Sequence, residues 1–135
     1  MTSTITYMGA LRCSSQHTYS GSIIETDAPL DNQGKAERFS PTDLVATALV
    51  NCMFTIMGIY ARDRAITIEG MKAEMKKVMY TEPRRMGEIH IDVYFPSQGS
   101  LLSDKDKDAL RRSAQSCPVL HSLHPEIKIH LQFHG

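Results

Sequence analysis

A long apolar segment at positions 44–60, interrupted only by Thr47, Asn51, Thr55 and Gly58, is the clearest feature of the hydrophobic pattern along this chain. A helix-start signal precedes it, because Ser40 and Asp43 have the spacing of a capping box and Pro41 suits the first helical position. The pattern therefore predicts a helix from Ser40 to about Ala61. Apolar residues occur on nearly every side of that helix, which is typical of a helix buried on every side.

The length of this helix has a consequence for assembly. At about 1.5 Å per residue it would be roughly 30 Å long, which a chain of 135 residues can hardly surround. Two subunits that share their long helices at a common core could bury it. We therefore expect an intertwined homodimer with this helix at its centre.

The remaining pattern predicts strands on both sides of the helix. Residues 3–27 alternate in short runs typical of strands, and residues 31–34 form a turn signal. After the helix, residues 66–80 predict a strand whose change of phase near Gly70 indicates a bulge. Residues 89–95 alternate as a half-buried antiparallel strand, and the two runs predict a hairpin.

The C-terminal part predicts two helices and a final strand. Residues 96–100 are expected to form a loop, and Ser103 has capping-box spacing for a helix that runs to about Ser116. Pro118 starts a further short helix, and residues 127–134 alternate as a strand. The order predicts an α+β fold with antiparallel sheets, organised as a single domain over all 135 residues.

Composition narrows the functional classes. Lys plus Arg and Asp plus Glu are both 15, so the chain lacks the basic excess of a nucleic-acid-binding protein, and nothing in it indicates a membrane partner. Residues 1–7 do not have the pattern of a secretory signal, and the apolar run is slightly short for a membrane span. With three cysteines and no signal, we expect a cytoplasmic protein with reduced thiols.

The cysteines carry the candidate chemistry, since common nucleotide-binding, zinc-protease and serine-hydrolase motifs are absent from the sequence. Cys52 lies in the middle of the long helix, where most cysteines are small buried hydrophobes. A reactive thiol there would need a cation from elsewhere. The options are Arg38, Arg12, Arg84 and Arg85, of which Arg38 lies two residues before the helix cap.

Cys117 occupies a different kind of position. The pair Cys117-Pro118 places the proline at the first helical position and the thiol at the N-cap, where backbone amides lower the pKa of a thiol. The alternative is an incidental cysteine beside a turn, as we expect for Cys13.

Two histidines leave a metal-binding alternative open. Cys52, Cys117, His121 and His124 are all residue types that bind zinc. Their spacing is not that of a zinc finger, and surface or helix-capping histidines explain His121 and His124 equally simply. We therefore expect neither a metal ion nor a cofactor, and keep a metal-binding dimer as an alternative.

Two segments resemble the OsmC/Ohr family of thiol-dependent peroxidases. Residues 40–52, Ser-Pro-Thr-Asp-Leu-Val-Ala-Thr-Ala-Leu-Val-Asn-Cys, resemble the family segment that runs into the cysteine helix, and residues 117–119, Cys-Pro-Val, resemble its resolving segment. The resemblance implies an OsmC-like fold, an intertwined homodimer with active sites built between subunits, and reduction of organic hydroperoxides. It also implies that Cys52 forms a sulfenic acid and a disulfide with Cys117, which a dithiol reductant of the lipoyl type would reduce.

One position departs from the family pattern. The peroxidase branches have a glutamate ten residues before the reactive cysteine, and this chain has Thr42 there. We expect the activating arginine to be Arg38, in the loop before the helix, with Arg12, in the N-terminal strands where some family members carry it, as the second candidate. The alternative that Thr42 favours is a non-enzymatic dimer that binds a small apolar ligand between its subunits.

Overall fold

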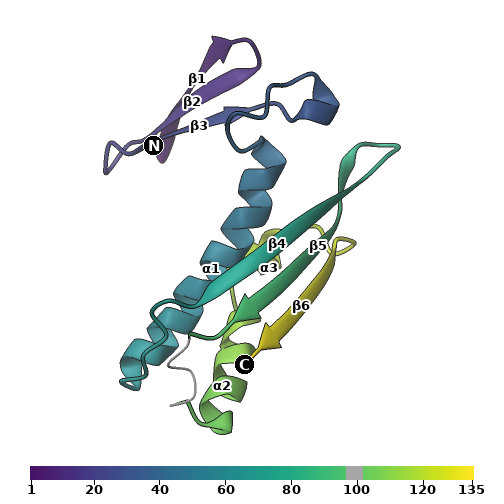
Figure 1. The fold of residues 1–135 in the computed structure, drawn as a ribbon. Helices are drawn as coiled ribbons and strands as arrows, with labels where there is room; N and C mark the ends of the chain where they lie inside the picture. Colours follow the sequence, from purple (N-terminus) through teal and green to yellow (C-terminus); the bar gives the residue numbers. More distant parts are fainter. Residues whose placement is uncertain (97–101) are drawn as a thin grey trace. The chain divides into compact units, whose positions relative to one another are not determined.

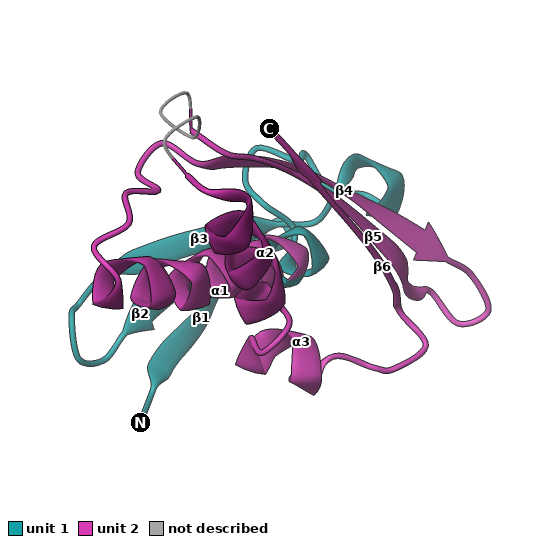
Figure 2. Ribbon diagram, turned by 90° about the horizontal axis from the view of Figure 1, so that it is seen from below, with its two compact units in different colours: residues 1–45 teal, residues 46–135 magenta. Residues whose placement is uncertain are grey.

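The computed structural model describes residues 1–96 and 102–135 (Figure 1). The loop expected at residues 96–100 lies outside these residues, apart from Pro96. The chain forms two compact units, residues 1–45 and residues 46–135, which Figure 2 distinguishes by colour. Each unit is described by itself below.

Unit 1, residues 1–45, contains a three-stranded antiparallel sheet. Its strands are β1 (Ser3–Gly9), β2 (Arg12–His17) and β3 (Ile23–Asp27), in the order β1-β2-β3. A single turn of 3-10 helix, η1 (Leu30–Asn32), follows. The strands predicted within residues 3–27 and the turn after them are confirmed.

One face of this sheet carries exposed apolar side chains. Ile5 pairs with Ser15, which pairs in turn with Ile24, so these three side chains share a face. Tyr7 lies two residues after Ile5 on the same strand and therefore on the same face. Ile5, Tyr7 and Ile24 are 61%, 62% and 49% exposed. Within one chain, about half or more of each of these side chains is therefore in contact with solvent.

Helix α1 (Pro41–Asp63) begins as the sequence predicts. The Ser40 hydroxyl accepts a hydrogen bond of 3.0 Å from the Asp43 amide, and the Asp43 carboxylate accepts one of 3.1 Å from the Ser40 amide. These two reciprocal bonds satisfy donors that a helix start leaves unpaired, so the predicted capping box is confirmed. The helix ends two residues beyond its expected end.

Unit 2, residues 46–135, contains the second sheet, with strands β4 (Lys72–Tyr80), β5 (Arg85–Tyr94) and β6 (Lys128–His134) in that order. The β4–β5 hairpin is antiparallel, as predicted. The expectation of antiparallel pairing is wrong for β6, which pairs with β5 in parallel. A parallel pair needs a long crossover connection, and this one includes α2 (Asp104–Ala114) and α3 (Pro118–Ser122).

Helix α2 also begins as predicted. The Ser103 hydroxyl accepts a hydrogen bond of 3.0 Å from the Asp106 amide. The helix ends at Ala114 rather than near Ser116, and Cys117 then caps α3.

The start of β4 differs from the sequence prediction. Residues 66–71 lie outside the strand, and a turn closes between Ile68 and Met71, whose amide donates to the Ile68 carbonyl at 3.0 Å. Gly70 adopts a φ of 89° in this turn, a backbone conformation that glycine tolerates. The phase change at Gly70 therefore marks a turn, and the irregularity of the hairpin lies between Val78 and Met79 instead.

One face of α1 packs in the core of unit 2, against β5 and α2 (Figure 1). The fully buried side chains of these elements include Leu49, Met53, Met57, Ile89, Ile91, Val93 and Leu110. Other positions on α1 are exposed, including Asn51, Thr55 and Ile59. Within one chain, the helix is therefore buried on one side and not on every side.

Among the described residues, α1 is the one helix long and apolar enough to cross a membrane by length and composition, and 33% of its most apolar window is buried. The core helix of a soluble protein has the same properties. Because one face of α1 packs in the core of unit 2, we describe it as such a core helix.

Candidate functional site

Unit 2 contains two of the three cysteines, Cys52 and Cys117. Cys52 lies on α1 and is half-buried, so part of its side chain remains accessible to solvent. Cys117 is completely buried and belongs to the hydrophobic core. The predicted positions, one in the long helix and one at a helix start, are confirmed, but the more deeply buried thiol is the one at the helix start.

Backbone groups from two helices hold the Cys117 thiol. The Leu120 amide donates to Cys117 Sγ at 3.2 Å, which makes the sulfur the N-cap of α3. The thiol in turn donates a longer contact of 3.9 Å to the Leu49 carbonyl of α1. Leu49 precedes Cys52 by three residues, so the start of α3 lies beside the turn of α1 that carries Cys52.

Burial raises the pKa of the Cys117 thiol above its usual value. The hydrogen bond from the Leu120 amide lowers the pKa, but by less, and the hydrogen bond and charge interaction with Cys52 raise it further. The predicted lowering of this pKa at the N-cap is therefore wrong, because complete burial removes the thiolate from water. Cys117 is a protonated thiol at neutral pH, held within hydrogen-bonding reach of Cys52.

Arg12 is held by carboxylates of unit 1. Its guanidinium donates to both oxygens of Asp27, at 2.7 and 2.9 Å, and to Glu37 at 2.9 Å. Asp27 is buried, and its hydrogen bonds from Arg12 hold the pKa of that carboxyl below its usual value. This bidentate pair fixes both the position and the orientation of the Arg12 guanidinium.

The other candidate arginines have different partners. Arg38 forms an ion pair of 3.1 Å with Glu25 and donates to the Glu37 carbonyl at 3.0 Å. Arg85 donates to the carbonyls of Thr81 and Pro83 in the β4–β5 turn. Arg12 and Arg38 belong to unit 1, whereas Cys52 belongs to unit 2. Each unit is described by itself, so the identity of the arginine that stabilises the Cys52 thiolate stays a prediction.

Thr42 and Asp43, which stand at the start of α1, are engaged locally. The Thr42 hydroxyl lies 3.3 Å from the Ser40 hydroxyl, and the Asp43 carboxylate accepts the Ser40 amide. Asp43 therefore serves the helix cap, as expected from the sequence.

The histidines expected as alternative metal ligands are engaged with the backbone. His121 Nε2 lies 3.1 Å from the Gln115 carbonyl, and His124 Nδ1 accepts from the Glu126 amide at 3.1 Å. Within residues 1–96 and 102–135, one group of three potential ligands lies close enough to hold a metal ion, namely Glu88, His90 and His130. The sequence analysis missed this group, although the outward positions of β5 and β6 carry its members.

The comparisons with known proteins agree on one family. A family model described as OsmC-like protein matches residues 34–132. No curated protein matches the chain. The crystal structure of a protein from Psychrobacter arcticus 273-4, named for osmotic stress induction and detoxification response, is similar with a TM-score of 0.93 and 49% identity over 99% of this chain and 96% of that one.

Two more distant structures share the fold. An organic hydroperoxide resistance protein OsmC from Legionella pneumophila has a TM-score of 0.75 and 15% identity, and the match covers 100% of this chain and 98% of that one. An organic hydroperoxide resistance protein from Vibrio cholerae, with captopril bound in one of its active sites, has a TM-score of 0.73 and 13% identity, with 100% and 92% coverage. Both matches extend along the whole of the present chain.

Proposed function

Since this chain belongs to the OsmC-like family, we propose that it is a cysteine-based peroxidase that reduces organic hydroperoxides to alcohols. The names of the Legionella and Vibrio proteins refer to organic hydroperoxide resistance, which supports this substrate class. The observation that carries the proposal is the pairing of Cys52 with Cys117, a half-buried thiol beside a buried one.

In the first step, Cys52 is the attacking thiol. Its thiolate displaces the alkoxide from one peroxide oxygen, so that the O–O bond breaks, Cys52 becomes a sulfenic acid, and the alkoxide takes up a proton to leave as an alcohol. Cys52 suits this role better than Cys117 because it is the more accessible thiol. The raised pKa of Cys117 keeps that thiol protonated while Cys52 reacts.

In the second step, Cys117 resolves the sulfenic acid. Its sulfur attacks Cys52 Sγ, a disulfide forms, and the sulfenic oxygen leaves as water with the proton of the Cys117 thiol. A dithiol reductant of the lipoyl type then reduces the disulfide by exchange and is itself oxidised. The location of Cys117 beside the Cys52 turn of α1 supports this step, since it limits the movement required.

An arginine is expected to stabilise the Cys52 thiolate and to polarise the peroxide. Arg12 and Arg38 are both candidates, and the geometry of unit 1 favours Arg12. Asp27 and Glu37 orient its guanidinium as the family glutamate would, a role that Thr42 is unable to fill. The pair with Glu25 holds Arg38 less firmly, because it is a single ion pair between partly exposed side chains.

The proposed active form is a cytoplasmic homodimer of single-domain subunits. The family model includes residues of both compact units, which supports one domain over the whole chain. Exposed apolar side chains support the homodimer, because a second subunit would bury them. They include Ile5, Tyr7 and Ile24 of unit 1 and Ile59 of α1. A dimer of this kind would bury the remaining side of the long helix.

Consumption of cumene hydroperoxide by the dithiol-reduced protein tests the proposal. We expect rapid consumption by the wild type, none above background by Cys52→Ser, and a trappable Cys52 sulfenic acid in Cys117→Ser. Cys13→Ser is the matched control and should behave as the wild type. Consumption no faster in the wild type than in Cys52→Ser would reject the peroxidase and leave the ligand-binding dimer as the better account.

A further inference from the structure

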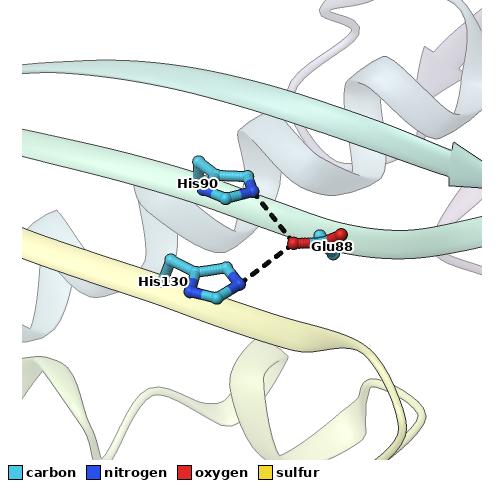
Figure 3. Close-up of side chains that lie close together, drawn as sticks. All are labelled: Glu88, His90 and His130. Carbon is cyan, nitrogen blue, oxygen red and sulfur yellow. Dashed lines mark hydrogen bonds and ion pairs between the residues drawn. The ribbon is translucent and has the colours of Figure 1, made fainter.

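The outer face of the β4–β5–β6 sheet carries a cluster of ionisable side chains that the peroxidase mechanism does not use. Glu88 and His90 lie two residues apart on β5, and His130 lies directly opposite His90 on β6. Side chains two residues apart on a strand share a face. Figure 3 shows both imidazole rings directed at one oxygen of the Glu88 carboxylate.

The distances within the cluster suit a metal ion. His90 Nε2 and His130 Nε2 each lie 3.1 Å from Glu88 Oε1, and all three ligand atoms lie within 4.8 Å of one another. In a tetrahedral zinc site with bonds of about 2.0–2.1 Å, neighbouring ligand atoms are about 3.3 Å apart. Two of the three separations already have nearly this length.

We propose that Glu88, His90 and His130 form a binding site for a divalent transition metal ion of the zinc class, separate from the thiol pair. Two imidazoles and one carboxylate are ligands that such ions accept, and they leave a further position open. The side chains of His90 and His130 are 42% and 49% exposed, so an ion and a coordinating water can reach them.

Tyr80 acts as an orienting group for this site. Its hydroxyl donates to Glu88 Oε2 at 2.9 Å, which leaves Oε1 directed at the two histidines. Groups that hold a ligand from behind in this way strengthen metal binding.

Metal binding requires only a small rearrangement. The two rings stack with centroids 4.3 Å apart and an interplanar angle of 9°, so each must tilt to direct its Nε2 lone pair at a common ion. The terminal torsion of histidine is broad and allows this movement. Each ring then carries its proton on Nδ1, and the ion replaces the two hydrogen bonds to Glu88 Oε1.

The site lies away from the thiols. Glu88 and His90 alternate along β5 with Ile89 and Ile91, which are buried in the core against α1. The metal ligands therefore face away from the helix that carries Cys52.

The same face of the sheet offers a matched control. His134 Nε2 lies 2.8 Å from Asp92 Oδ1, and its ring stacks on Tyr94 with centroids 4.8 Å apart. This second pair has a histidine, a carboxylate and a similar exposure, but lacks the second histidine. It should not bind the ion by itself.

Titration of the reduced protein with Co²⁺, a spectroscopic substitute for Zn²⁺, tests the proposal, with Zn²⁺ binding measured by calorimetry. We expect one ion per chain and visible cobalt bands without the intense near-ultraviolet absorption of thiolate ligation. His90→Gln and His130→Gln should weaken Zn²⁺ binding at least about tenfold, and Tyr80→Phe about tenfold. His134→Gln should bind as the wild type.

Histidine NMR signals provide a readout that needs no variant. The imidazole resonances of His90 and His130 should shift when Zn²⁺ is added, and those of His134 should not. Absence of one-to-one binding, thiolate bands in the cobalt spectrum, or equal weakening by His134→Gln and His130→Gln would overturn the proposal.

Discussion

The two faces of the β4–β5–β6 sheet differ in chemistry although the same strands form both. The inner face of β5 presents Ile89, Ile91 and Val93 to the core that also contains Cys117. The outer face presents Glu88 and His90 to solvent beside β6. Strict alternation along β5 directs apolar side chains to the core that contains Cys117 and ionisable side chains to the surface.

The contrast shows how environment sets the state of each group. Inside, burial raises the pKa of Cys117 and keeps its thiol protonated. Outside, the hydrogen bond from Tyr80 is the main cause that lowers the pKa of Glu88. A buried thiol with a raised pKa and a carboxylate with a lowered pKa therefore lie on opposite sides of one sheet.

The largest expected effect is that two variants each lose one activity and keep the other. Cys52→Ser should lose all hydroperoxide consumption and keep Zn²⁺ binding, because Cys52 lies on the inner side. His90→Gln should keep consumption and lose most Zn²⁺ binding. Parallel peroxidase assays and calorimetry on both proteins measure this. If either variant lost both properties while remaining folded, the two faces would not be independent.

A second comparison concerns stability at adjacent positions of β5. Ile91→Ala should lower the free energy of unfolding by about 2–5 kcal/mol, because it leaves a cavity at a completely buried position. Asp92→Asn should change it by less than about 1 kcal/mol, since its contact with His134 is exposed to solvent. Urea unfolding with unchanged m values measures both. Similar losses would contradict the assignment of inner and outer faces.

The cap of α1 should have a smaller effect. Ser40→Ala removes the acceptor for the Asp43 amide at a buried position and should cost about 1 kcal/mol. Ser103→Ala removes the corresponding acceptor of α2 at an exposed position and should cost less, because water can replace it. Chemical unfolding compares the two variants, and a larger loss for Ser103→Ala would speak against the buried cap.

The smallest effect concerns acid stability in unit 1. Arg12 lowers the pKa of Asp27, so the pair stabilises the fold fully above the unfolded pKa of about 3.9 and loses this contribution as the pH falls through the lower folded value. Glu37 and Arg38 also face this carboxyl. In melting curves between pH 2 and 6, Asp27→Asn should remove part of the acid-dependent decrease in Tm. An unchanged pH profile would reject this role.

Local signals in the sequence predicted much of the fold. The capping boxes at Ser40 and Ser103 were predictable because each depends on residues three positions apart. Strand alternation in β5 and β6 was also predictable, because it depends on residues two positions apart. The turn at Gly70 was not, because a phase change has the same appearance in a bulge and in a turn.

Non-local features of the site could not be predicted. The parallel register that brings His130 opposite His90 depends on a crossover of more than thirty residues. Complete burial of Cys117 depends on how α3 packs against α1, so its raised pKa was missed. The contacts of Arg12 with Asp27 and Glu37 were also missed, because the alternation pattern does not show which residues distant in the sequence will meet.

The most direct test of the central claim, that Cys52 and Cys117 form a redox pair, is peptide mapping of the reduced protein after one equivalent of cumene hydroperoxide. The account predicts a Cys52–Cys117 disulfide that a dithiol reverses, with Cys13 still a free thiol. Oxidation that leaves Cys52 and Cys117 unlinked, or that links either of them to Cys13 instead, would contradict it.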